Sequence, residues 1–252
     1  MPAGRRVYAI GDIHGRVDLL RLLHDRIAED ARGAPSLRHC IVYLGDYIDR
    51  GPYSREVIEL LLEGPPTGFE AVCLKGNHEE LMLRFLEDAK MGLGWLLNGG
   101  DATLQSYGIG VLRALGGDGS RLDGLREHLA AEAPSRHVGF LRRLERWHIE
   151  GDYLFVHAGI LPGVALDDQK DEDILWIREA FLHDKRDHGK VVVHGHSITE
   201  APEVRQNRIG IDTGAYATGV LTCLVLEGSG HRFLSTADGR KLGAAPPRNG
   251  LD

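Results

Sequence analysis

Short apolar runs, each followed by a polar loop and then by an amphipathic helical pattern, recur three times in the first part of the chain. In the helical stretches, apolar residues are spaced three and four apart, as on the buried face of a helix. Short apolar strands that alternate with such helices are typical of a parallel sheet covered by helices. The pattern therefore predicts an α/β fold. The predicted strands are residues 7–10, 40–44 and 71–74, and the helices that follow them are residues 17–27, 54–62 and 79–86.

The pattern changes between about residues 90 and 150. Glycine-rich turns and polar helical segments at 127–132 and 138–148 replace it, and no strand is predicted there. We interpret this segment as a helical cap inserted into a single domain that spans residues 1–240. Gly, Pro and Arg are frequent after Ala237, so residues 241–252 are predicted to form a flexible tail. Strand patterns return at 153–156, 191–193, 208–211, 220–226 and 232–235, with a helix at 174–182.

The charge and the cysteines argue against several classes of function. The net charge is −7, with 30 basic and 37 acidic residues, so the chain as a whole does not attract nucleic acid or an anionic membrane. The first apolar run is too short for a secretory signal or a membrane span, and we expect a cytoplasmic protein. The three cysteines lie in apolar stretches, which favours buried reduced thiols over a disulfide or a thiolate metal site.

Polar side chains follow five of the predicted strands, at the point where each strand ends. In an open parallel sheet, ligands bind beyond the carboxyl ends of the strands, where loops from several units meet. A single such loop is explained by helix capping and turn formation alone. Five in succession favour one shared crevice. The side chains concerned are Asp12, His14, Asp46, Asp49, Arg50, Asn77, His78, His157, His194 and His196.

Acidic groups gathered in one crevice repel one another, and a divalent cation removes that conflict. The ligand mixture of two carboxylates, one amide oxygen and three imidazoles suits manganese, iron or zinc better than calcium. Six candidate ligands exceed what one catalytic ion takes while keeping an open position, so we expect two divalent ions, most favourably manganese. Asp46, directly after its strand, is placed to bridge the pair. Arg50 offers a planar fork of donors for phosphate oxygens. The alternative interpretation is that Arg50 lies on the surface and pairs with Asp49 or Glu56.

The ordered motifs GDIHG, GDYIDRG, GNHE, HAG and GH resemble those of the calcineurin-like metallophosphoesterases, specifically the phosphoprotein phosphatase branch and its bacterial and phage relatives. The resemblance spans residues 7–214. It implies a layered α-β-β-α sandwich with an inserted helical cap segment. It also implies that Asp12 and His14 bind the first metal ion and that Asp46 bridges. Asn77, His157 and His196 would hold the second ion.

The resemblance assigns roles to the remaining side chains as well. His78 would protonate the leaving alcohol and Asp49 would orient it, whereas the alternative is that both only cap their loops. Arg178, in LWIRE, matches a second phosphate-contacting arginine, although one arginine on an apolar helix is common. Asp212, in IDTGA, is interpreted as structural. His194 has no counterpart in the family's motif. It is interpreted either as a structural group or a group that supports the ligands, or as a direct contact in the site.

The implied reaction is in-line attack by a metal-bound hydroxide on phosphorus, with no covalent intermediate. The leading function is a serine/threonine protein phosphatase, whose partner is a phosphorylated protein or a small phosphoester. The first alternative is a symmetrical dinucleoside tetraphosphate hydrolase, although those enzymes typically carry Gln where His14 stands and lack the acid that matches Asp49. A catalytically silent binding protein on the same fold is the other alternative. Substrate choice is assigned to the segment 90–150, in which residues 98–108 resemble a stretch of bacterial relatives and could edge the pocket.

Overall fold

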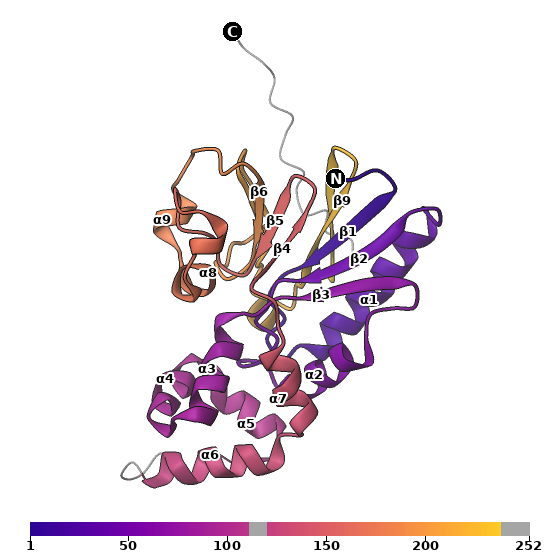
Figure 1. The fold of residues 1–252 in the computed structure, drawn as a ribbon. Helices are drawn as coiled ribbons and strands as arrows, with labels where there is room; N and C mark the ends of the chain where they lie inside the picture. Colours follow the sequence, from indigo (N-terminus) through magenta and orange to yellow (C-terminus); the bar gives the residue numbers. More distant parts are fainter. Residues whose placement is uncertain (111–119, 238–252) are drawn as a thin grey trace.

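The computed structural model describes residues 1–110 and 120–237, and within them the strands form two five-stranded sheets packed face to face (Figure 1). The first sheet has the order β10-β9-β1-β2-β3 and the second the order β4-β5-β6-β8-β7. The strands of the first sheet are β1 (Arg5–Ile10), β2 (Arg38–Tyr43), β3 (Phe69–Cys73), β9 (Thr222–Glu227) and β10 (Gly230–Ser235). Those of the second are β4 (Trp147–Glu150), β5 (Tyr153–Val156), β6 (Val191–His194), β7 (Glu203–Val204) and β8 (Arg208–Gly210).

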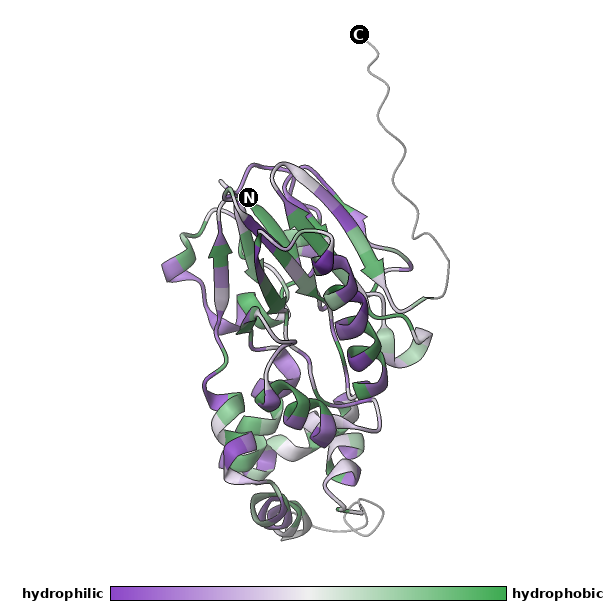
Figure 2. Cartoon of the chain, turned by 90° about the vertical axis from the view of Figure 1, so that its right-hand side faces the viewer, coloured by the Kyte–Doolittle hydropathy of each residue, from purple (hydrophilic) through white to green (hydrophobic). Residues whose placement is uncertain are grey.

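Each sheet is covered on its outer side by helices, so the layers run helix, sheet, sheet, helix (Figure 1). The alternation of side chains along a strand builds these layers. On β1, Tyr8 and Ile10 point toward the helices, and Val7 and Ala9 point toward the second sheet. Because both faces are covered, β1 is buried along its whole length. The predicted α/β sandwich is therefore confirmed, and hydrophobic stretches lie on the strands as well as on the helices that cover them (Figure 2).

The first three strand–helix units form as predicted, with β1, β2 and β3 parallel to one another. The sheets as a whole are mixed, because β9 runs antiparallel to β1 and β10 antiparallel to β9. The helices that belong to these units are α1 (Val17–Arg32), α2 (Ser54–Glu63) and α3 (Asn77–Glu87). All three parallel strands therefore end toward the same edge of the sheet.

Two predictions of local structure were wrong. The expected helix at 138–148 ends at Arg142, and Trp147–Glu150 forms β4, which pairs antiparallel with β5. The two residues between these strands are Gly151, at φ 59°, and Asp152, a connection that favours a tight hairpin. The expected helix at 174–182 is interrupted at Arg178, whose φ of −131° and ψ of −100° are not helical. The pieces are α8 (Asp171–Trp176) and α9 (Glu179–Leu182).

The segment between β3 and β4 is helical and gathers beyond one end of the strands (Figure 1). Its helices share the core of α2 and α3, through buried residues such as Trp95, Leu104 and Leu129. The predicted tail at 241–252 lies outside the described residues. The elements of this segment are η1 (Ala89–Met91), α4 (Gly92–Trp95), the kinked η2 (Leu96–Gly100), α5 (Asp101–Ser106), α6 (Ser120–Glu132) and α7 (Ser135–Arg142).

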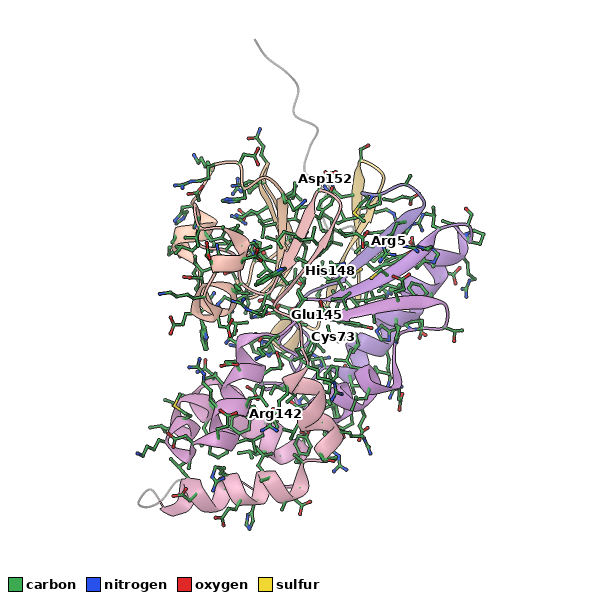
Figure 3. All side chains as sticks on the ribbon, viewed as in Figure 1. Arg5, Cys73, Arg142, Glu145, His148 and Asp152 are labelled. Atoms are coloured by element: carbon green, nitrogen blue, oxygen red, sulfur yellow. The ribbon has the colours of Figure 1, made fainter. Side chains whose placement is uncertain are left out.

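Where the helical segment rejoins the sheets, it is tied to the end of β3. The Glu145 N–H donates to the Cys73 carbonyl oxygen at 3.0 Å, and both residues lie at this junction in Figure 3. Further along, the Arg5 guanidinium on β1 pairs with Glu150 on β4 at 2.8 Å, which joins the two sheets. Cys40 and Cys223 are buried and Cys73 is half-buried, all as free thiols. The remaining short helices are η3 (Leu166–Asp168) and α10 (Ala215–Thr218).

Among the described residues, no helix has both the length and the apolar character needed to cross a membrane.

Candidate metal centre and active site

Backbone hydrogen bonds hold the strand-end loops against one another. The His14 N–H donates to the Asp46 carbonyl oxygen at 2.8 Å, which ties the loop after β1 to the loop after β2. The Gly195 N–H donates to the His157 carbonyl oxygen at 2.8 Å and ties the loops after β5 and β6 in the same way. These bonds bring residues that are far apart in the sequence to one edge of the sandwich.

The backbone of these loops is unusual. In the described part of the chain, five residues other than glycine have a positive φ, between 46° and 70°, and all of them are predicted site residues. Such a conformation costs free energy for a residue with a Cβ and persists only where the surroundings enforce it. The strain is therefore concentrated at the predicted site. The five residues are His14, Asp46, Asp49, Arg50 and His196.

Potential metal-binding atoms come together in two groups that share Asp46. In one group, the ligand atoms of His14, Asp46 and His78 lie within 4.8 Å of one another, and in the other those of Asp46, His157 and His196 do. All of these side chains are buried. Burial raises the pKa of Asp46, and the charge of Glu79 raises it further. A buried carboxylate common to two imidazole-bearing groups is suited to bridging two cations.

The Nδ1 hydrogen bonds of His14 and His157 leave the Nε2 nitrogen of each ring unprotonated and within the convergent groups. His14 Nδ1 lies 2.8 Å from the Ile48 carbonyl oxygen, and His157 Nδ1 lies 2.9 Å from the Leu44 carbonyl oxygen. Because a carbonyl oxygen only accepts, each Nδ1 carries the proton and each Nε2 presents a lone pair. Burial lowers the pKa of His14 and lowers that of His157 to about 3, so both rings stay neutral. Neutral imidazoles held by a second hydrogen bond are typical of metal ligands.

Two further observations at this site fit a cation. His157 Nε2 lies 2.9 Å from Asn77 Oδ1 and 3.4 Å from Asp46 Oδ1, so a lone pair faces two oxygens. His196 Nε2 is buried without a hydrogen-bond partner. Burial, followed by the proximity of His157, lowers the pKa of His196 and keeps it neutral. Electron-rich atoms that converge without donors are explained by a positive ion among them.

Asp12 lies beside these groups but is not part of either. Its carboxylate accepts the His196 N–H, at 3.2 Å from Oδ1 and 3.1 Å from Oδ2. Burial raises its pKa well above the ordinary value, and the charges of Asp212 and Asp46 raise it further. Asp212, which we interpreted as structural, is therefore a close electrostatic neighbour of a predicted ligand. His194, in contrast, contacts Arg208 and Phe181 on the other side of β6.

Asp49 and His78 form a buried pair. His78 Nδ1 lies 2.7 Å from Asp49 Oδ2, and both side chains are at most 1% exposed. Burial raises the pKa of Asp49 to about 8, against the hydrogen bonds from Thr103 and Trp95. Burial and the charge of Arg50 lower the pKa of His78 to about 3. The ring presents its other nitrogen, Nε2, to the site, 3.8 Å from Asp46 Oδ2 and without a hydrogen-bond partner.

The two predicted arginines differ in their surroundings. Arg50 NH1 lies 3.0 Å from His14 Nε2, and its guanidinium stands 5.0 Å from the centre of the Tyr216 ring. Arg178 is exposed, and its guanidinium donates to Ser197 Oγ at 3.3 Å. Arg50 is thus part of the convergent group. Arg178 is connected to that group less directly, because it contacts Ser197, the residue that follows the predicted ligand His196.

Sequence reasoning missed Glu79, which is fully buried next to His78. Its carboxylate accepts the backbone N–H groups of Asp46 and Gly76 at 2.9 Å and of Tyr47 at 2.8 Å. This fork holds the loop that carries Asp46 against the start of α3. The residue is the last letter of GNHE, so the motif contained the signal. Trp95 and Thr103, which contact Asp49, carried no comparable signal in the sequence.

Comparison with known proteins agrees with the geometry. The family model for calcineurin-like phosphoesterases matches residues 5–219. The chain belongs to the calcineurin-like phosphoesterase family, whose members hydrolyse phosphoesters and use divalent metal ions. The prediction of the family is therefore confirmed.

Individual relatives carry two kinds of name. The chain is 28% identical over 232 residues to serine/threonine-protein phosphatase 2 of Salmonella typhimurium, covering 86% of this chain and 91% of that protein. It is 30% identical over 157 residues to a symmetrical bis(5'-nucleosyl)-tetraphosphatase of Aromatoleum aromaticum, covering 62% of this chain. The chain spans about half the length of the tetraphosphatases it matches, 45% in that case. A cold-active protein-tyrosine phosphatase of a Shewanella species has a similar fold, with a TM-score of 0.59, 19% identity and coverage of 93% and 80% of the two chains.

Proposed function

We propose that the protein is a metal-dependent phosphomonoester hydrolase and that its substrates are phosphoserine and phosphothreonine in proteins. The observation that carries this proposal is the Asp49–His78 pair, 2.7 Å apart, with the free His78 Nε2 beside Asp46. Cleavage of a phosphomonoester expels an alkoxide, which needs a proton as it leaves. An imidazole held by a carboxylate and facing the site supplies that proton.

The ligands proposed for two divalent ions, most favourably manganese, are the six donors predicted from the sequence. Asp12 and His14 would hold the first ion, Asn77, His157 and His196 the second, and Asp46 both. The chemistry that such ions supply is the activation of a water molecule and the neutralisation of phosphoryl charge. The neutral imidazoles and the converging oxygens support this assignment.

The other side chains of the site would bind the phosphoryl group and move one proton. Arg50 and Arg178 would donate to the phosphoryl oxygens as their charge redistributes. For this step His78 must first take up a second proton, on Nε2, as the anionic phosphoryl group binds beside it. As the bond between phosphorus and the leaving oxygen breaks, Nε2 would pass that proton to the leaving oxygen, and the ring would return to its neutral form with Nδ1–H on Asp49. Asp49 would keep the ring oriented through Nδ1.

A symmetrical dinucleoside tetraphosphate hydrolase is the second candidate, because several relatives carry that name. The Asp49–His78 pair favours the first candidate, since it serves a leaving group that needs a proton, whereas a phosphate leaving group is a weaker base. A catalytically silent protein on the same fold is the third. The cytoplasmic location, the single domain over 1–240 with an insertion at about 90–150, and the flexible tail stay predictions.

One set of assays separates the candidates. We expect the purified protein, with manganese added, to hydrolyse 4-nitrophenyl phosphate and a panel of phosphoserine and phosphothreonine peptides, and to cleave diadenosine tetraphosphate far more slowly. The His78→Asn variant is the control, and it should lose turnover of the peptides. Preferential cleavage of diadenosine tetraphosphate would overturn the protein phosphatase assignment. Absence of turnover on every substrate would support the silent binding protein.

A further inference from the structure

The carboxylate of Asp49 is enclosed by two side chains from the helical segment that follows α3. Trp95, at the end of α4, donates its indole Nε1–H to Asp49 Oδ2 at 2.9 Å. Thr103, on α5, donates its hydroxyl to Asp49 Oδ1 at 2.5 Å. Both side chains are fully buried. Each carboxylate oxygen therefore has a fixed donor that comes from outside the strand-end loops.

The chemistry of these donors determines how His78 is held. An indole N–H can only donate, so the oxygen it contacts must accept. When Asp49 is ionised, its Oδ2 accepts from Trp95 and from His78 Nδ1 together. With Nδ1 committed to Asp49, Nε2 is the nitrogen left for the leaving group. Rotation of the carboxylate about its bond would break the bonds to both Trp95 and Thr103.

The backbone of Asp49 and that of Arg50 are held by the same segment. Thr103 Oγ1 also accepts the Asp49 N–H at 2.9 Å, and Ser54 Oγ shares that N–H at 3.0 Å. The Gly99 carbonyl oxygen accepts the Arg50 N–H at 3.1 Å. Asp49 and Arg50 have positive φ values of 70° and 67°. Such backbone conformations persist only where surrounding contacts hold them, and these hydrogen bonds are contacts of that kind. A Cβ on Gly99 would lie 2.8 Å from Arg50 Cγ, so the segment and the loop fit closely.

We propose that Trp95 and Thr103 are positioning residues for the proton-donating step: they fix both oxygens of Asp49, and through them the ring of His78, so that Nε2 faces the leaving oxygen. This inference rests on the proposed phosphomonoesterase function. It gives the 95–103 part of the helical segment a role in the reaction itself, in addition to the substrate selection that we expected of the segment.

The test compares leaving groups that differ in their need for a proton. In Thr103→Val, which keeps the shape but removes the hydroxyl, we expect kcat on an alkyl phosphate such as a phosphoserine peptide to fall about 10- to 100-fold, the usual effect of losing an outer hydrogen bond that orients a site group. On 4-nitrophenyl phosphate, whose leaving group needs little protonation, the loss should be only a few-fold. Thr103→Ser restores the hydroxyl and should restore the alkyl phosphate rate.

A matched control is Thr236→Val. Thr236 is also a buried threonine whose hydroxyl contacts the backbone, at Leu221 and Gly219, in a part of the fold that does not contact Asp49. It should lower the midpoint of thermal unfolding without changing the ratio of the two rates. Trp95→Phe removes only the indole donor and provides a second variant, with the same selective loss on the alkyl phosphate expected.

A measurement on the metal-free protein separates this inference from the proposed function. The His78 Nδ1–H, bonded to a carboxylate, should give a low-field proton resonance, identified by its absence in His78→Asn. We expect the resonance to shift or vanish in Thr103→Val and Trp95→Phe and to persist in Thr103→Ser and Thr236→Val. An unchanged resonance, or equal losses on both esters, would overturn the positioning role. If no phosphoester is hydrolysed by the wild type, the proposed function fails, and the resonance still decides whether the two residues orient His78.

Discussion

The two halves of the candidate site are built differently. The half that follows β1, β2 and β3 is held by internal hydrogen bonds, chiefly the Glu79 fork to the Asp46 loop and the Asp49–His78 pair. The half that follows β5 and β6 has fewer such bonds. His196 Nε2 is without a partner, and Arg178 is exposed and bonded only weakly, to Ser197 at 3.3 Å.

This difference indicates which half depends on the metal ions. In the first half, hydrogen bonds within the protein hold the Asp46 loop and both oxygens of Asp49, and His78 Nε2, the nitrogen left for the leaving group, is the buried atom without a partner. Such bonds fix the geometry before any ion binds. Where ligand nitrogens are buried without partners, the ions must complete the arrangement. We therefore expect a preformed first half, which carries the proposed bridging acid Asp46 and the proposed proton donor His78, and a second half that is completed on metal binding.

The largest effect is expected at Asp46, where the halves meet. Asp46→Asn removes the charge shared by both ligand groups, and we expect a loss of at least about 1,000-fold in turnover, or about 4 kcal/mol of transition-state stabilisation. Because Asn tolerates the φ of 51° at this position, the fold should persist. Steady-state rates and circular dichroism check both statements. A folded variant with wild-type turnover would remove Asp46 from its proposed role.

The next largest effect is expected at Glu79, which holds the first half together. Glu79→Gln replaces one accepting oxygen by an NH₂ group that faces backbone N–H donors, and we expect the free energy of unfolding to fall by about 2–4 kcal/mol. Glu80→Gln is the matched control on the same helix, since Glu80 pairs with Lys75 and Arg84 nearer the surface. Its effect should stay below about 1 kcal/mol. Urea unfolding compares the two, and equal losses would contradict the view that Glu79 braces the site.

Removal of the metal ions tests the difference between the halves directly. With ion in 100-fold excess over its dissociation constant, chelation should cost about 2.7 kcal/mol of stability for each site. Hydrogen exchange should then rise more in residues 157–160 and 195–198 than in residues 45–51 and 76–79. Equal increases in both halves, measured by mass spectrometry with and without chelator, would show that the first half is not preformed.

The smallest effect is expected at Arg178. Because its guanidinium is exposed and lies at the edge of the site, Arg178→Ala should lower kcat/KM about 10-fold, mainly by raising KM. Arg186→Ala is the control, since Arg186 is also exposed and pairs with Asp184 on the surface. A loss as large as that of Asp46→Asn would mean that the second half is as essential to the chemistry as the first.

Local patterns in the sequence were sufficient for the α/β class and for the predicted side chains that follow the strands, whereas the layered sandwich of two sheets was implied by the resemblance of the motifs to a known family. Short apolar runs between helical patterns predicted most of the strands, and the loops that follow parallel strands share one edge of the sheet. The same approach failed for β4, where the hairpin at Gly151 outweighed an apparent helical pattern. The sequence pattern also predicted one continuous helix at 174–182 and did not show that it is interrupted at Arg178.

By itself, then, the sequence determined which side chains are available at the carboxyl ends of the strands and, through their types, that they suit divalent cations and phosphate. Only the tertiary structure decided the positive φ angles that aim them, the approach of Asp212 to Asp12, and the contact of Thr103 with Asp49 across 54 residues. The physical reason is the distance along the chain over which each effect acts. Periodicity and residue type act between neighbours in the chain, whereas strain and buried hydrogen bonds depend on how distant segments pack.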